Sequence, residues 1–195
     1  MRTPPLVLAS SSPQRRAILE RLGVSFTVRP AAVDELDLGE PGAVALENAL
    51  RKARAARAPV PVPVPGAQEV VLGCDTLVAL DGAIYGKPPD EDAARTTLLA
   101  LQGTTHEVVS GLALLLPDGE RTALARTKVT FRAFDGALLD WYLATGEWRG
   151  RAGGYAIQGA GAALVRGVEG DYENVVGLPL AALLDICPEL LFACK

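Results

Sequence analysis

The sequence predicts an α/β protein (mixed α+β) whose sheet contains antiparallel as well as parallel strands. Apolar, strand-like segments alternate with helical segments along the 195 residues, as in sheets that are covered by helices. Asp81-Gly82 and the Pro-Asp-Gly segment 117–119 are hairpin signals, and hairpins join antiparallel strands. A purely parallel sheet is therefore not expected.

The first expected unit is a strand that leads into a helix. The apolar run 6–10 ends in small residues and is followed by Ser12 and Pro13, which are typical of a helix N-cap and first turn. Gly23 is typical of the residue that follows the last turn. We therefore expect a strand and then a helix from about Pro13 to Leu22.

A second strand is expected around Phe26, and it is followed by an acidic loop. The alanine-rich segment 42–57 predicts a helix in which Glu47 and Arg51 are spaced for an ion pair. In segment 58–66, alternate residues are prolines without an N–H group, so it cannot form a helix interior. We expect an extended surface connector there.

The middle of the chain predicts three further strands and one helix. Segment 69–80 is a β-rich run interrupted by Gly73, and it precedes the first hairpin signal. A helix is expected after Asp90, ending near Gly103. Two long strands are expected on either side of the second hairpin signal.

The last third predicts two helices and more strands. A short helix is expected to begin at Asp135, and a final one at about Pro179. Between them, the glycine-rich segment predicts strands on both sides of a Gly170-Asp171 turn.

Composition limits the class of protein. The net charge of −4 and the pI near 5.1 argue against a nucleic-acid binder, which would need a local basic patch. The three cysteines lack metal-ligand spacing and suit reduced thiols. The sequence has no apolar run of the ~20 residues that span a bilayer, and its N-terminal apolar run is too short for a signal peptide. We expect a cytoplasmic protein that binds neither membrane nor nucleic acid.

The first turn of the first helix raises a question of charge. Arg15 and Arg16 lie where the free N–H groups of a helix already carry positive charge. An anion bound there would accommodate both, with Ser10 and Ser11 as additional donors. Alternatively, both arginine side chains are simply solvated. The sequence leaves the two interpretations open.

Asp75, Gln158 and His106 are the most informative polar residues. Asp75 lies in a β-rich run, so it either needs a metal, cation or donor or faces water on an edge strand. Gln158 lies among glycines, where its amide could hydrogen-bond a ligand. His106 is the only histidine, and we expect a structural hydrogen bond there. Taken alone, three other charged residues predict only solvated charges: Glu35, Lys52 and Lys87.

Together, these carboxylates, cations and glycine-rich loops indicate phosphoryl or nucleotidyl chemistry assisted by a divalent ion. The sequence contains no GxxxxGK[ST] motif, which excludes a P-loop. The sequence has a single histidine and no suitably placed serine or cysteine to pair with it, so it does not favour a catalytic triad for acyl transfer.

Five segments, taken in order, resemble the Maf family of nucleoside triphosphate pyrophosphatases, whose fold is related to that of the inosine triphosphate pyrophosphatases. They span residues 6 to 180 and include LASSSPQRRAILERLG, ALRKARA, GCDTLVALDGAIYGKPPDEDAA, LQGTTHEVVSG and AGGYAIQGAGAALVRGVEGDYENVVGLPL. The resemblance implies a single domain over 1–195 with an elongated, twisted mixed sheet flanked by helices. Two lobes would share one central cleft.

The resemblance also implies a set of site residues. Asp75 would be the catalytic carboxylate and Glu35 a second acid, and both would bind Mg²⁺ or Mn²⁺. The substrate-binding positions would be Ser10, Arg15, Lys52, Thr76, Lys87 and Gln158. The implied reaction is hydrolysis between the α- and β-phosphates, giving a nucleoside monophosphate and pyrophosphate.

The Y-x-I-Q-G pattern at 155–159 resembles the branch that acts on dTTP and UTP. The alternatives are a pyrophosphatase for a modified nucleotide such as 7-methyl-GTP, or a non-catalytic nucleotide-binding regulator of cell division and septum formation. A homodimer is a possible family-level expectation. Two positions depart from the family pattern: Gln14 replaces an arginine, so that one phosphate contact would be either weaker or supplied by Arg16, and Arg151 replaces a lysine.

Overall fold

A seven-stranded mixed sheet forms the centre of the structure, a computed structural model that describes residues 5–57 and 69–191. The strand order is β2-β1-β3-β5-β6-β7, and β4 pairs with β3. The strands are β1 (Leu6–Leu8), β2 (Phe26–Val28), β3 (Val70–Leu80), β4 (Ala83–Tyr85), β5 (Thr105–Leu116), β6 (Gly119–Phe131) and β7 (Val165–Glu169). β1 is parallel to both β2 and β3, and all other pairs are antiparallel, so the predicted mixed sheet is confirmed.

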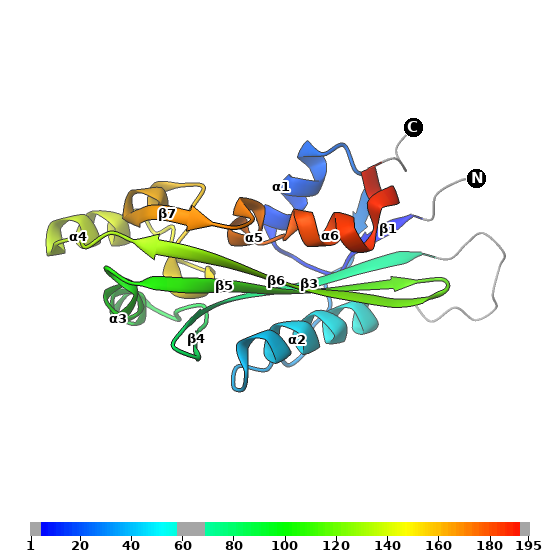
Figure 1. Ribbon diagram of the computed structural model, residues 1–195, viewed down its shortest axis with the longest axis horizontal. Helices are drawn as coiled ribbons and strands as arrows, with labels where there is room; N and C mark the ends of the chain where they lie inside the picture. Colours follow the sequence, from blue (N-terminus) through cyan, green and yellow to red (C-terminus); the bar gives the residue numbers. More distant parts are fainter. Residues whose placement is uncertain (1–4, 58–68, 192–195) are drawn as a thin grey trace.

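Helices cover both faces of this sheet. They are α1 (Pro13–Arg21), α2 (Pro41–Ala56), α3 (Glu91–Leu101), α4 (Gly136–Ala144), α5 (Tyr172–Val176) and α6 (Leu180–Ile186). Figure 1 shows α2 on one side of the long strands and α1, α5 and α6 on the other. Among the described residues, no helix is both long and apolar enough to cross a membrane.

The β1–α1 unit forms as its sequence predicts. The Ser12 hydroxyl accepts a hydrogen bond from the Arg15 backbone N–H at 3.4 Å, and Pro13 occupies the first helical position. After the helix, Gly23 has φ = +70°, a conformation that favours glycine. The Gly23 N–H donates to Glu20 O and the next N–H, of Val24, donates to Leu19 O. Four residues separate β1 from the helix, which is followed by a glycine that ends it.

Two glycines bring α2 unusually close to the sheet. A Cβ atom on Gly73 of β3 would lie 2.2 Å from the carbonyl oxygen of Ala49. One on Gly111 of β5, which pairs with Asp75, would lie 2.4 Å from the carbonyl oxygen of Ala45. Alanines on α2 and glycines on the strands thus allow a close approach that larger side chains would prevent. Polar side chains of α2 can consequently reach the middle of β3.

Two large apolar clusters pack along opposite halves of β3 and β5. The first includes Leu72 and Leu114 and packs against α1 and α6, whereas the second includes Val78 and Val108 and packs against α3 and α4. Asp75 lies between these clusters along β3, but its side chain is on the opposite face of the sheet, towards α2. The description as one domain with two lobes stays a prediction.

The segment after Gly170 differs from its prediction. β7 precedes the turn as expected, but α5 follows it in place of a strand. The Asp171 carboxylate accepts a hydrogen bond from the Glu173 N–H at 2.8 Å, so it caps a helix rather than opening a hairpin. The predicted connector 58–66 lies outside the described residues.

His106 occupies a structural position on β5. Its side chain is 1% exposed, its Nε2 lies 2.9 Å from the Tyr155 hydroxyl, and its ring meets that of Phe131 edge-on. Burial lowers the pKa of His106 to about 4. The ring is therefore neutral at pH 7 and is not a site residue.

This buried ring predicts a pH-dependent stability. The unfolded histidine, with a pKa of about 6.5, binds a proton before the folded one does, so stability is complete above pH 6.5 and is lost as the pH falls towards 4. Between pH 7.5 and pH 5 we expect the free energy of unfolding to fall by about 2 kcal/mol, measured by urea denaturation. A His106→Gln variant should be less stable but should lose most of this slope; an unchanged slope would contradict the assignment.

Candidate active site

The sequence-predicted site residues meet in one pocket of about 280 Å³. Its wall is formed by the start of α1, the acidic loop before α2, the middle of β3 and the glycine-rich segment before β7. The predicted residues among its lining are Ser10, Arg15, Glu35, Lys52, Asp75, Thr76, Lys87 and Gln158. Their functional roles stay predictions, but their proximity is a property of the structure.

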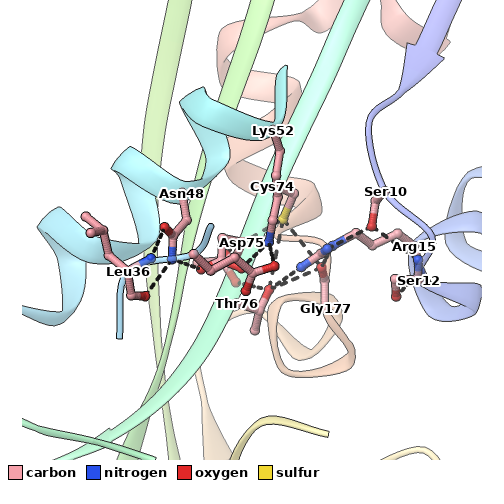
Figure 2. Close-up of polar contacts among 12 residues, drawn as sticks. Ser10, Ser12, Arg15, Leu36, Asn48, Lys52, Cys74, Asp75, Thr76 and Gly177 are labelled. Carbon is pink, nitrogen blue, oxygen red and sulfur yellow. Dashed lines mark hydrogen bonds and ion pairs between the residues drawn. The ribbon is translucent and has the colours of Figure 1, made fainter. Parts of the chain in front are cut away.

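Asp75 is a buried carboxylate with two donors. Asp75 is 7% exposed, and its Oδ1 accepts a hydrogen bond from Lys52 Nζ at 2.6 Å. Its Oδ2 accepts one from Asn48 Nδ2 at 3.0 Å (Figure 2). Burial by itself raises the pKa of this carboxyl, but the charge of Lys52 and the hydrogen bonds from Lys52 and Asn48 outweigh it and hold the pKa below its usual value. Asp75 is therefore ionised at neutral pH.

The position of Asp75 decides between its two sequence-based interpretations. β3 pairs with β5 at Asp75, but its pairing with β1 ends at Leu72 and its pairing with β4 begins at Val78, so no described strand pairs with the other edge of β3 at Asp75. Asp75 is nevertheless only 7% exposed and pairs with Lys52, so the interpretation of an aspartate facing water is wrong, and the expected cationic partner is present.

Lys52 joins the two predicted acids. Its Nζ lies 2.8 Å from Glu35 Oε1 as well as 2.6 Å from Asp75 Oδ1. The residue is 8% exposed, so the expectation of a solvated basic face is wrong for Lys52. The close approach of α2 across Gly73 turns this lysine inwards. Glu35, with a side chain 43% exposed, lies nearer the solvent.

The structure distinguishes the two arginines of α1, while anion binding by Arg15 stays a prediction. Arg15 is buried and donates from Nε to Gly177 O at 2.7 Å, from Nη1 to Ser10 Oγ at 3.0 Å and from Nη2 to Thr76 Oγ1 at 3.1 Å (Figure 2). Arg16 instead pairs with Glu20 in the solvent. The expectation that Arg16 replaces a missing family arginine is therefore not supported, whereas Gln14 itself lines the pocket.

A second wall carries the remaining cations. The Gly153 N–H donates to Gly86 O at 3.1 Å, which joins the Lys87 segment to the turn that carries Arg151. Arg151 lines the pocket, and in the described part of the chain its buried Nε–H has no hydrogen-bond acceptor. Gln158 lines the same pocket and is exposed. Lys87, Arg151 and Gln158 thus add further donors to the pocket lining.

Comparison with known proteins gives the family. A family model described as Maf-like protein matches residues 5–190. The chain belongs to the Maf-like protein family. The resemblance inferred from its motifs is confirmed.

Curated relatives of this Maf-like chain are similar over nearly their whole length. A dTTP/UTP pyrophosphatase of Anaeromyxobacter sp. (strain Fw109-5) is 47% identical over 188 residues, covering 93% of this chain and 87% of the relative. The dTTP/UTP pyrophosphatase of Pyrococcus furiosus is 42% identical over 181 residues, covering 93% of each. That of Deinococcus radiodurans is 42% identical over 182 residues, covering 93% and 90%.

Sequence reasoning missed two residues that organise this Maf-like site. Asn48 contacts Asp75, and its place four positions before Lys52, on the same face of a helix, was a usable signal. Gly177 offers its carbonyl oxygen to Arg15 and, at 3.3 Å, to the Thr76 hydroxyl. No local signal identifies a backbone acceptor 162 positions away from the arginine it binds.

Glu35 and Asp75 are the carboxylates that could hold a divalent ion. Both already reach one cationic group, Lys52 Nζ, so their oxygens converge on a single region of the pocket. Within residues 5–57 and 69–191, no group of three or more His, Cys, Asp or Glu side chains is placed to hold a metal ion. Carboxylate oxygens are the ligands that Mg²⁺ and Mn²⁺ prefer, and Mg²⁺ commonly takes one or two of them together with substrate phosphates. The residues therefore fit an ion that arrives with a nucleotide.

Proposed function

We propose that this protein hydrolyses dTTP and UTP between the α- and β-phosphates and releases the nucleoside monophosphate and pyrophosphate. The observation that carries the proposal is the ionised Asp75 carboxylate beside Arg15 in one pocket. Relatives 42–47% identical that are named dTTP/UTP pyrophosphatases support the same activity.

The triphosphate lies against the start of α1. Of the five N–H groups of Arg15, three are used by acceptors in the described part of the chain, which leaves two for phosphate oxygens. Pro13 has no N–H, and the N–H groups of Arg15 and Arg16 donate to Ser12. The Gln14 N–H and the hydroxyl groups of Ser10 and Ser11 are therefore the donors that the start of α1 adds to this region. Arg151 and Lys87 line the same pocket, supply further positive charge and stabilise the departing pyrophosphate.

Asp75 receives the proton of the attacking water. The water oxygen forms a bond to the α-phosphorus while the bond from that phosphorus to the bridging oxygen breaks, and the electron pair leaves with pyrophosphate. Asp75 is a competent acceptor because it is ionised and held in place by two donors. Lys52 keeps Asp75 and Glu35 close together despite their like charges.

Asp75 and Glu35 are also the residues that hold Mg²⁺ or Mn²⁺ in this proposal. Such an ion, when bound, neutralises charge on the phosphate oxygens. The exposed Glu35 side chain can move towards an ion more freely than Asp75 can, since Asp75 is buried and has two hydrogen bonds.

Gln158 is the candidate reader of the base. Its amide offers a donor and an acceptor, which matches the neighbouring acceptor and N–H groups on the edge of uracil or thymine. The 5-methyl group that separates the two bases lies away from this edge. A single amide therefore suits an enzyme that accepts both dTTP and UTP.

A panel of nucleoside triphosphates tests the function. With Mg²⁺, we expect dTTP and UTP to yield pyrophosphate faster than GTP, ATP and 7-methyl-GTP, with little release when EDTA is present. Preference for 7-methyl-GTP would favour the modified-nucleotide alternative. Tight binding of dTTP without any pyrophosphate release would favour the regulatory alternative. Cytoplasmic location, the possible homodimer and the lack of nucleic-acid binding stay proposals on sequence grounds.

A further inference from the structure

Asn48 connects the catalytic strand to the acidic loop. The residue is 1% exposed, and its Nδ2 donates both to Asp75 Oδ2 at 3.0 Å and to Leu36 O at 2.9 Å. Its Oδ1 accepts a hydrogen bond from the Leu36 N–H at 2.8 Å. One amide thus holds both backbone groups of Leu36 and one oxygen of Asp75 (Figure 2).

Neighbouring side chains of α2 hold the same loop. Arg51 Nη1 donates to Asp34 O at 3.2 Å, and Lys52 Nζ lies 2.8 Å from Glu35 Oε1. Residues 48, 51 and 52 are spaced i, i+3 and i+4, so they project from one face of the helix. Three successive loop residues are consequently docked on α2, but only Asn48 and Lys52 also reach Asp75.

We propose that Asn48 is a positioning residue that holds the Asp75 carboxylate and the Glu35 loop in one arrangement around Lys52. The proposal rests on the proposed function, in which Asp75 receives the proton of the attacking water. With Oδ2 held by Asn48 and Oδ1 by Lys52, the carboxylate has a single orientation. Without the Asn48 amide, it could rotate, and the loop could move away from it.

Asn48 acts through Asp75 rather than on the nucleotide. It is not among the described residues that line the pocket, and both N–H groups and the oxygen of its amide already have partners in the protein. Its loss should therefore lower kcat and leave KM nearly unchanged. A residue that contributed only to stability would lower the fraction of folded enzyme and change neither constant per folded molecule.

The first experiment compares two variants by steady-state kinetics with dTTP and Mg²⁺. Asn48→Leu removes every hydrogen bond of the amide, whereas Asn48→Asp keeps an acceptor for the Leu36 N–H but presents a carboxylate to Asp75. In both, we expect kcat to fall 10- to 100-fold, the usual cost of losing a supporting hydrogen bond, while KM changes by less than about threefold. A wild-type kcat in either variant would overturn the proposal.

A double-mutant cycle separates positioning from an independent effect. If Asn48 acts through Asp75, adding Asn48→Leu to Asp75→Asn should lower kcat no further than Asp75→Asn does alone. If the two losses multiply, Asn48 does not act through Asp75. Asn174→Leu is the matched control, because Asn174 is the other asparagine of the chain and is also buried, but donates to Val108 O and Thr127 Oγ1. It should lower the melting temperature without lowering kcat per folded molecule.

Hydrogen exchange provides a readout that does not depend on activity. In Asn48→Leu, the backbone amide of Leu36 should exchange at least tenfold faster than in the wild type, whereas Asn48→Asp and Asn174→Leu should leave it protected. An unchanged rate in Asn48→Leu would overturn the proposal. If the exchange result holds but the wild type releases no pyrophosphate from any nucleotide, the proposed function fails, and with it the catalytic role of Asn48, while the docking of the loop stands.

Discussion

Replacing Asp75 with asparagine is expected to lower kcat for dTTP hydrolysis by about 100-fold or more while leaving the fold intact. The amide has the same shape as the carboxylate but cannot accept the proton of water at neutral pH. The variant should still fold. Asparagine at position 75 is uncharged, but Lys52 keeps its ion pair with Glu35, at 2.8 Å, so its buried charge still has a partner. Pyrophosphate release at saturating dTTP and a thermal melt are the two measurements.

The matched control is Asp140→Asn. Asp140 lies on α4, pairs with Arg95 of α3 and has a side chain that is 64% exposed, so its neutralisation changes the net charge equally. Its kcat should equal that of the wild type. Turnover within a few-fold of wild type in Asp75→Asn would remove Asp75 from the mechanism.

Replacing Arg15 with alanine is expected to weaken the binding of a non-hydrolysable dTTP analogue by about 100-fold. The two N–H groups of Arg15 that face the triphosphate form charge-assisted hydrogen bonds, each contributing about 1.5 kcal/mol or more, and about 1.4 kcal/mol corresponds to tenfold in affinity. The variant also loses the contacts with Gly177 and Thr76 that connect α1 to β3 and α5. Isothermal titration calorimetry with the analogue measures the effect directly.

The adjacent residue provides the control for Arg15. Arg16 carries the same side chain on the same helix, but it is paired with Glu20 and has a side chain that is 62% exposed. Arg16→Ala should bind the analogue with nearly wild-type affinity. Equal affinities of Arg15→Ala and Arg16→Ala would show that the triphosphate does not lie at the start of α1.

Much of the local structure could be predicted because its causes lie within a few residues. Ser12, Pro13 and Gly23 define the ends of α1 by capping and by backbone conformation. Asp81 and Gly82 connect β3 to β4 as the hairpin signal predicts. The same reasoning was wrong after Gly170, because an aspartate is as suitable for capping a helix as for a turn. Turn signals indicate a change of direction but do not say which element follows.

The pocket was less predictable because its contacts join distant segments. The charges of Lys52 and Glu35 were evident, but the burial of Lys52 was not, since residues 42–57 considered alone form a basic helix. Arg15 and Arg16 cannot be distinguished by type or by neighbourhood in the sequence. Only the acceptors at Ser10, Thr76 and Gly177 make one of them a buried residue.

By itself, the sequence determined most of the helix starts, the hairpins at Asp81-Gly82 and at 117–119 and, through its motifs, the family. The tertiary structure decided which partner Asp75 has, which arginine turns inwards and that Asn48 ties the acidic loop to β3. For Asp75 and Asn48 the physical reason is the approach of α2 to the sheet across Gly73 and Gly111, and for Arg15 it is the packing of α1 against the acceptors on β3 and after α5. That packing sets the burial and charge of each side chain through contacts that no local pattern of residues contains.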